Sequence, residues 1–286
     1  MNNSSRGIDG DAKVLTKAAG CVAIKDLDHR CASVWDGEQY SVSYTAKQPL
    51  TKHICSVKLN DSSTLMTSPN YLFDIIVPSK GSYRELTKKI SACNLTYDSQ
   101  LPLFSIPPPS IHHHYGVLKN PYISGLNLFR KTSTFSEKLP LLAEEVPAFE
   151  TCLSDKMQFI SGVIDKYGII NDRARIELLG RTYLSLLNLK LFLQEIGVES
   201  FIRPVLKSKP FKLVILRNGV NNLLRGGLLL KRKQIKMDRS IDEFTLPTII
   251  EGYDLIDNNT SINLFHIESF ANNKICVNGS VINDSK

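Results

Sequence analysis

Cysteine and histidine side chains could bind a metal or act as nucleophiles, but their spacing in this chain favours neither. The six cysteines are scattered without a CxxC pair, so the pattern indicates neither a zinc site nor a disulfide framework. Three consecutive histidines (112–114) follow three prolines (107–109) and could form a metal clip. Because no carboxylate or cysteine stands nearby at ligand spacing, an exposed loop is favoured. We expect reduced, mostly buried cysteines.

Basic side chains are concentrated in one part of the chain. Residues 171–239 contain 15 Lys/Arg against 5 Asp/Glu, a balance of +10, whereas the remainder has 20 against 23, a balance of −3. Lysine and arginine at this density neutralise phosphates and give salt-sensitive binding to nucleic acid. A solvated basic face without a partner is the alternative. No aromatic ladder for single-stranded nucleic acid is evident.

Length and composition predict two domains of ordinary globular type. The chain has 286 residues, 42% of them hydrophobic and 22% charged, with a single tryptophan, and domains usually contain roughly 100–200 residues. No apolar run approaches the roughly 20 residues that cross a bilayer, and the polar first residues do not resemble a signal peptide. We expect an intracellular protein, in the cytoplasm or nucleus, with a viral or phage origin left open and no membrane partner.

The first 80 residues and the last 30 are typical of short strands. Turn signals divide β-branched and aromatic runs at 13–16, 21–24, 32–35, 40–44, 54–59 and 71–77. Even spacing of short strands favours a compact all-β domain. The segment 100–120 is rich in proline and histidine and is expected to be a linker. Strands return at 253–282, which suggests that the tail completes the first domain.

Between these two parts the hydrophobic period changes to that of helices. Helices are predicted at 121–129, 154–164, 182–196 and 219–230, and strands at 168–170, 175–179, 200–206 and 211–216. From residue 154 the predicted order is helix, strand, strand, helix, strand, strand, helix. The helical part would then be an insertion in a β domain.

Several segments of the expected β domain, in order, resemble the Hint domain of inteins, especially inteins of ribonucleotide reductases. GDAKVLT (10–16), IKDL (24–27) and VWDGE (34–38) resemble the amino-terminal splicing block. Residues 59–73 resemble the block that normally carries a T-x-x-H signature, and 265–268 with 276–285 resemble the carboxyl-terminal block. The resemblance implies a Hint fold and descent from a self-splicing protein.

The position equivalent to the first splicing nucleophile does not carry a nucleophile. Splicing begins with attack by a Cys or Ser side chain on its own peptide carbonyl, and an acyl shift requires such an activated group. The equivalent position falls near Gly7, which has no side chain. If the register were shifted by a residue or two, Ser4 or Ser5 would be the nucleophile instead.

The remaining splicing positions are also changed. Autocatalysis needs a His to protonate the scissile amide and an Asn that cyclises at the carboxyl end. Ser68 and Tyr71 occupy the Thr and His positions of the T-x-x-H signature, and Asn283-Asp284 stands in place of His-Asn. Ser285 could still be the downstream acceptor. The resemblance therefore implies that complete splicing has been lost.

The inserted region resembles a LAGLIDADG, or dodecapeptide, homing endonuclease. Residues 146–149 resemble the approach to its motif, and FISGVIDKYGII (159–170) resembles the motif. In that family the central glycine, here Gly162, lets two helices pack backbone to backbone, and the acid before the final glycine binds the divalent metal. Tyr167 stands at the acid position, and a phenol does not replace a carboxylate as a Mg²⁺ ligand at neutral pH. Asp165 could be a residual ligand, although its position mostly caps and packs the helix.

A second copy of the motif is reduced. ISGLNLFR (123–130) shares the Ile-Ser-Gly core and would supply Gly125 to the helix packing, with Arg130 at the acid position. Only about 37 residues separate the two copies, too few for a complete first unit. An ordinary core helix is the alternative for this segment.

The strands of the expected insertion carry the basic residues that would face DNA in this family. Alternation along a strand places Arg173 and Arg175 on the same face, whereas Arg217 and Lys212 would point to opposite faces. The expected DNA-binding residues are Arg173, Arg175, Arg203, Lys207, Lys209, Lys212, Arg217, Lys231, Arg232 and Lys233.

These observations predict an α+β protein: an all-β Hint domain (1–118 and 246–286) interrupted by a reduced LAGLIDADG domain of αββαββα order (119–245). The expected activity is binding of double-stranded DNA by a degenerate protein that has lost splicing and cleavage, without a cofactor. One alternative is an active endonuclease that uses Mg²⁺ and works as a homodimer. Another is a structural or protein-interaction module.

Overall fold

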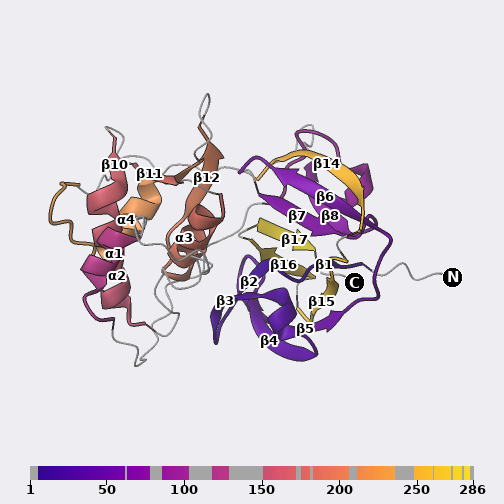
Figure 1. The fold of residues 1–286 in the computed structure, drawn as a ribbon. Coiled ribbons are helices and arrows are strands. Elements are labelled where there is room, and N and C mark those ends of the chain that lie inside the picture. The colour runs from indigo at the N-terminus through magenta and orange to yellow at the C-terminus, as the bar shows by residue number, and fades with distance from the viewer. Residues whose placement is uncertain are drawn as a thin grey trace. The chain divides into compact units, whose positions relative to one another are not determined.

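The chain divides into two compact units. Unit 1 comprises Met1–Pro107 and Thr245–Lys286, and unit 2 comprises Pro108–Phe244, whereas the sequence placed the boundaries at 118/119 and 245/246. Figure 1 shows the fold, coloured along the chain. None of the helices in the described residues is both long and apolar enough to span a membrane. The computed structural model describes residues 6–61, 63–77, 86–102, 118–128, 151–171, 175–180, 183–205, 211–235, 248–259, 261–271, 273–278 and 280–283.

Unit 1 is built from antiparallel strands and two short 3-10 helices. The strands β8 (Leu72–Val77) and β9 (Leu86–Ser91) pair with each other and precede η2 (Ala92–Asn94). The other elements are β1 (Ile8–Asp9), β2 (Lys13–Thr16), β3 (Gly20–Ala23), η1 (Ile24–Leu27), β4 (Arg30–Trp35), β5 (Tyr40–Lys47), β6 (His53–Leu59), β7 (Thr64–Thr67), β14 (Ile250–Asp257), β15 (Leu264–Ser269), β16 (Lys274–Val277) and β17 (Ser280–Asn283).

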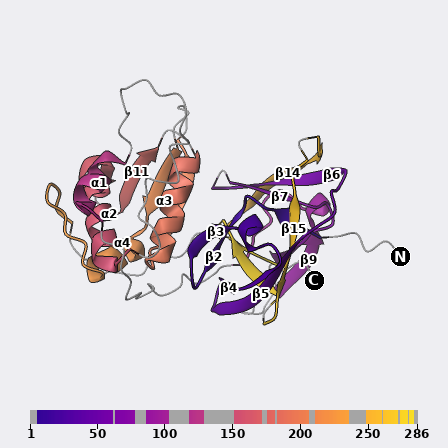
Figure 2. The same ribbon diagram turned by 60° about the horizontal axis from the view of Figure 1, so that its bottom comes forward.

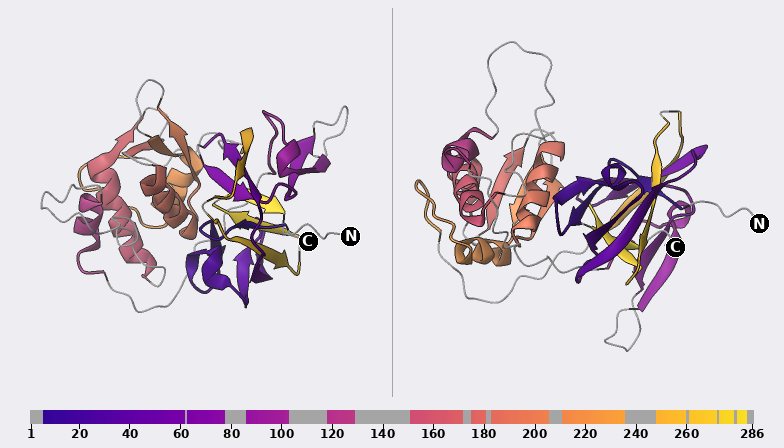
Figure 3. Two further views of the ribbon diagram at one scale, coloured as in Figure 1. Left: turned by 45° about the vertical axis from the view of Figure 1, so that its right-hand side comes forward. Right: turned by 90° about the horizontal axis from the view of Figure 1, so that it is seen from below.

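The strands that follow the insertion lie among the strands that precede it. The large sheet has the order β14-β6-β7-β1-β15-β5-β4-β2-β16-β17, with β3 on β2. Ile8 pairs with Phe265, and Val14 pairs with Val277. In Figure 3 the yellow carboxyl-terminal strands run among the indigo strands. The tail therefore completes the β unit.

The core of unit 1 comes from the inward-facing positions of these strands. On β5 buried Ser41, Ser43 and Thr45 alternate with more exposed residues, as expected for a strand with one covered face. Fully buried large side chains such as Ile8 and Phe73 join one apolar cluster. Burial of such a side chain stabilises the fold by about 1.5–3 kcal/mol. Trp35, the only tryptophan, is buried in a smaller cluster of the same unit.

Unit 2 has the element order that the hydrophobic periods predict. Its sheet has the order β10-β11-β13-β12. Ile176, Leu178, Ile202 and Leu213 are completely buried on one face, and α3 contacts three of the strands (Figure 2). The elements are α1 (Pro121–Asn127), α2 (Leu153–Tyr167), β10 (Gly168–Ile170), β11 (Ile176–Gly180), α3 (Tyr183–Glu195), β12 (Ser200–Pro204), β13 (Phe211–Ile215) and α4 (Arg217–Arg225).

The last helix begins and ends earlier than the sequence predicts. It covers Arg217–Arg225 instead of 219–230. Gly226 caps it, and Gly227 has φ +96°, a conformation that favours glycine and ends a helix. Arg217 therefore lies in the first turn of a helix and not on or between the strands of the sheet.

Candidate functional site

Two of the residues expected at splicing positions in unit 1, Gly7 and Ser68, are joined by two hydrogen bonds. Gly7 precedes β1 and Ser68 follows β7, and the two strands pair through Ile8 and Thr67. The Gly7 N–H donates to Ser68 Oγ (3.0 Å), and the Ser68 N–H donates to the Gly7 carbonyl (2.8 Å). Both residues are buried. Ser68 thus binds both backbone polar groups of Gly7.

The same network continues to the carboxyl-terminal strand. The Tyr71 N–H donates to the Ser68 carbonyl (3.0 Å), and the Tyr71 hydroxyl donates to the carbonyl of Asn283. The Asp74 N–H donates to Asn283 Oδ1 (3.0 Å). Tyr71 has no exposed surface, and its ring packs edge-on against Phe73. Four positions that the sequence singled out therefore meet in one buried cluster, which we call the clasp (Gly7, Ser68, Tyr71 and Asn283).

The clasp lacks the groups that peptide rearrangement needs. A Cβ added at Gly7 would lie 2.9 Å from Leu264 Cβ, so the space for a nucleophile is filled. A phenol, with a usual pKa of about 10, is a weak proton donor to an amide at neutral pH compared with a histidine. Tyr71 instead directs its proton to the Asn283 carbonyl. The cluster is chemically suited to holding two chain segments together.

In unit 2, the two glycines of the repeated Ile-Ser-Gly segments lie where α1 and α2 approach most closely. A Cβ on Gly125 would lie 1.9 Å from the Phe159 carbonyl oxygen and 3.0 Å from the Val163 nitrogen. A Cβ on Gly162 would lie 2.1 Å from the Tyr122 carbonyl oxygen and 3.0 Å from the nitrogen of Leu126. Each glycine thus meets the residues three before and one after the other glycine. The contact is reciprocal, as for two copies of one motif related by a local twofold axis.

Asp165, in the last turn of α2, holds the segment that follows α4. It is 4% exposed. Its Oδ2 accepts hydrogen bonds from the Tyr122 hydroxyl (2.9 Å) and the Lys231 N–H (2.7 Å), and its Oδ1 accepts one from the Arg232 N–H (3.1 Å). Burial raises the pKa of Tyr122, and its hydrogen bond to Asp165 raises it further. The side chain therefore anchors a loop through two backbone donors.

Two lysines of the same loop also contact the helix pair. Lys233 Nζ donates to the carbonyls of Ile164 (2.7 Å) and Gly168 at the carboxyl end of α2, where a cation is favoured by the helix dipole. Burial lowers the pKa of Lys233, and the nearby Asp165 carboxylate opposes that shift. Lys231 Nζ lies 4.2 Å from the centre of the Tyr122 ring. Both lysines, which the sequence assigned to DNA, have partners at α1 and α2.

The end of α2 offers few free ligand atoms to a divalent metal ion. Magnesium needs oxygen ligands with available lone pairs, and the three hydrogen bonds to Asp165 use three of the roughly four lone-pair sites of its carboxylate. The Tyr167 hydroxyl donates to the Leu126 carbonyl (3.0 Å). Within the described ranges, no group of three or more His, Cys, Asp or Glu could hold a metal.

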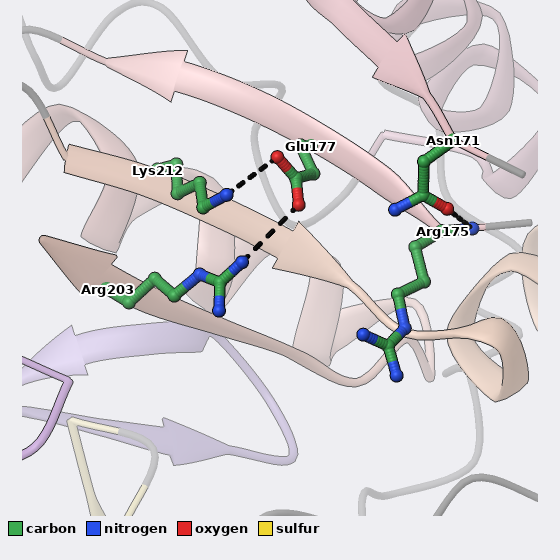
Figure 4. Close-up of polar contacts among 5 residues, drawn as sticks. All are labelled: Asn171, Arg175, Glu177, Arg203 and Lys212. Carbon is green, nitrogen blue, oxygen red and sulfur yellow. Dashed lines mark hydrogen bonds and ion pairs between the residues drawn. The ribbon is translucent and has the colours of Figure 1, made fainter. Parts of the chain in front are cut away.

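The open face of the unit 2 sheet carries cations arranged around one carboxylate (Figure 4). Lys212 Nζ lies 2.8 Å from Glu177 Oε2, and Arg203 Nη2 lies 3.5 Å from Glu177 Oε1. The Arg175 N–H donates to Asn171 Oδ1 (3.0 Å), and its guanidinium points away from Glu177. We call Arg175, Glu177, Arg203 and Lys212 the charged face. Sequence reasoning missed Glu177 as a partner, although its two-residue spacing from Arg175 places it on the same face.

Part of the predicted site falls outside the described residues. The positions concerned are Arg130, Arg173, Lys207, Lys209, Asp284 and Ser285.

Comparison with known proteins gave matches only among solved structures. No protein-family model and no curated protein sequence matches the chain. The Ssp DnaB mini-intein variant M86 is 9% identical with a TM-score of 0.36, over 100% of this chain and 98% of that chain. The Pab PolII intein is 9% identical with a TM-score of 0.35, over 97% and 99%. The PabCDC21-1 intein is 11% identical with a TM-score of 0.31, over 34% and 72%. Because these TM-scores lie below 0.5, the similarities decide neither fold nor function.

Proposed function

We propose that the chain is an intein-derived protein whose splicing centre has become a structural clasp. The observation that carries this proposal is the buried hydrogen-bond network joining Gly7, Ser68, Tyr71 and Asn283. These positions are far apart in sequence, and the intein-like segments assigned all four to one reaction centre. The reciprocal contact of Gly125 and Gly162 supports the further proposal that unit 2 derives from a LAGLIDADG endonuclease.

The loss of splicing is tested by placing the intact chain between two soluble reporter proteins. We expect an uncleaved precursor on denaturing gels, because the first splicing position, Gly7, carries no nucleophile and the clasp contains no histidine. The double variant Gly7→Cys, Tyr71→His should also remain unspliced, since Leu264 Cβ lies 2.9 Å from the place of a Cβ at Gly7. Ligated reporters from the unmodified chain would refute the proposal.

We propose that unit 2 binds double-stranded DNA through the charged face. The supporting observation is that Arg203 and Lys212 pair with each other on the neighbouring strands β12 and β13, and that Arg175 directly precedes the adjoining strand β11. Each phosphate contact contributes about 0.9 to the slope of log affinity against log salt. Replacement of Arg175 or Arg203 by Glu should weaken duplex binding at low salt about tenfold and reduce that slope by about 1. Fluorescence anisotropy over a salt series measures both quantities.

Two further variants sharpen this test. Arg225→Glu, at an exposed residue that ends α4, makes the same charge change away from the charged face and should leave affinity within about twofold. Glu177→Gln removes the carboxylate that pairs with Arg203 and Lys212 and should raise affinity about threefold to tenfold. Equal effects of Arg203→Glu and Arg225→Glu would reject the charged face as the binding surface. Plasmid incubated with Mg²⁺ or Mn²⁺ should remain uncut, because Tyr167 stands at the position of the metal-binding acid and Asp165 is engaged by the backbone of Lys231 and Arg232.

A further inference from the structure

The strand β14 forms the edge of the large sheet in unit 1. It pairs with β6 on one side and stands last in the strand order (Figures 1 and 2). On its other side Ile250, its first residue, pairs with the backbone of Asp98 and Ser99. Ile250 is completely buried, but Tyr253, Leu255 and Ile256 are 37%, 55% and 37% exposed. Three large apolar side chains exposed on one edge strand are unusual, because proteins generally protect such edges.

The apolar side chains of the partner strand β6 are covered, so the exposed apolar surface belongs to β14. Ile54, Cys55 and Val57 have no exposed surface. Burial raises the pKa of Cys55 to about 11, with smaller effects from Cys93 and Asp254. At this edge, the apolar side chains of β6 are therefore buried, whereas those of β14 beyond Ile250 are exposed to solvent.

The register shows which backbone groups of β14 point outward. The Asn258 N–H donates to the Lys52 carbonyl, and hydrogen-bonded positions alternate in an antiparallel pair. Ile256 and Asp254 therefore direct their N–H and C=O groups to β6, whereas Tyr253 and Leu255 direct theirs away. In the described part of the chain, no backbone group pairs with these outward groups of Tyr253 and Leu255. They form a row of donors and acceptors next to exposed apolar side chains.

The charges along β14 indicate the kind of strand that would pair with it. The strand carries Glu251, Asp254 and Asp257 and no basic residue. Lys58 and His53 of β6 face two of these acids, at 2.6 Å and 2.9 Å, but exposed pairs of this kind contribute little. A second copy pairing antiparallel about Asp254 would place acid opposite acid, which is destabilising. A basic strand would not meet this repulsion.

We propose that β14 binds an extended basic peptide, which adds as a further strand beyond Tyr253 and Leu255. Backbone hydrogen bonds to the outward groups would supply affinity, as in other cases of strand addition. Lysine or arginine opposite Asp254, and apolar residues opposite Tyr253 and Leu255, would supply specificity.

The probe is a fluorescent peptide of alternating Lys and Val, titrated against the full chain at moderate salt. A peptide of alternating Glu and Val, and the Lys/Val peptide with alternate backbone nitrogens methylated, are the matched controls. We expect saturable binding of the Lys/Val peptide, and binding at least about tenfold weaker for both controls, because one lacks the charge and the other lacks the backbone donors.

Two variants locate the binding. Leu255→Pro removes an outward N–H, which an edge strand tolerates, and Asp254→Lys reverses one charge. Each should weaken binding of the Lys/Val peptide at least about fivefold, whereas Asp26→Lys, an exposed reversal elsewhere in unit 1, should leave it unchanged. Circular dichroism shows whether each variant is folded. Absence of binding, equal binding of the Glu/Val peptide, or insensitivity to both variants would overturn the proposal. Dimerisation abolished by Leu255→Pro would also overturn it, in favour of a second copy.

Discussion

Replacement of Gly125 or Gly162 by alanine is expected to destabilise unit 2 strongly while leaving the stability of unit 1 unchanged. The added Cβ would lie 1.9 Å or 2.1 Å from a carbonyl oxygen of the facing helix, and backbone does not yield as a flexible side chain does. Separating α1 from α2 would also disturb the Tyr122 hydrogen bond to Asp165. We expect a loss of more than about 3 kcal/mol, at the upper end of overpacking effects.

The two units can be followed separately in the same sample. The α-helices of the described residues all lie in unit 2, whereas the single tryptophan, Trp35, lies in unit 1. Urea unfolding monitored by far-ultraviolet circular dichroism should shift to lower urea, while Trp35 fluorescence should not. Ser124→Ala changes the exposed neighbour on the same helix and should stay within about 0.5 kcal/mol. If Gly125→Ala behaved like Ser124→Ala, the close approach of the two helices would be disproved.

Removal of Tyr71 should have the largest effect on unit 1. Its ring has no exposed surface and its hydroxyl donates to the Asn283 carbonyl. Tyr71→Ala leaves a cavity and should destabilise the unit by about 3–5 kcal/mol. Tyr71→Phe keeps the ring and leaves the carbonyl without its donor, which costs about 1–3 kcal/mol.

Trp35 fluorescence in urea measures both losses, and the helical signal of unit 2 should be unchanged. Tyr97→Phe is the matched control, because that ring is 70% exposed and should change stability by less than about 0.5 kcal/mol. Equal stability of Tyr71→Phe and Tyr97→Phe would mean that the clasp does not hold the carboxyl-terminal strand.

The sequence predicted elements better than their ends. Periodicity gave β2 and β10 with their observed bounds and the order of helices and strands in unit 2. The end of α4 was misplaced because the apolar run 228–230 continues a helical pattern that Gly226 and Gly227 interrupt. The strands β1, β7 and β9 were not predicted. The strand β1 is only two residues long, and pairing by distant strands, not local preference, defines such an element.

The candidate sites were predictable as positions but not as contacts. The order of the intein-like segments selected Tyr71 and Asn283, yet the bond between them spans 212 residues. No local pattern predicts it. The hydrogen bonds from Lys231 and Arg232 to Asp165 also join distant residues, 66 and 67 positions apart. The sequence therefore predicted these cations as exposed DNA-binding residues. Glu177 is different, since strand alternation alone would have placed it among the cations.

The interleaved order of the large sheet constrains how the chain matures on the ribosome. The strand β15 stands between β1 and β5, so neither can complete its pairing before residues 264–269 have been synthesised. Unit 2 lies wholly upstream of that point and can fold as soon as it emerges. A folded unit 2 shortens the flexible chain between the early and the late strands, which lowers the entropy lost when they join. Unit 2, which follows the first part of unit 1 along the chain, is therefore the first of the two units able to finish folding.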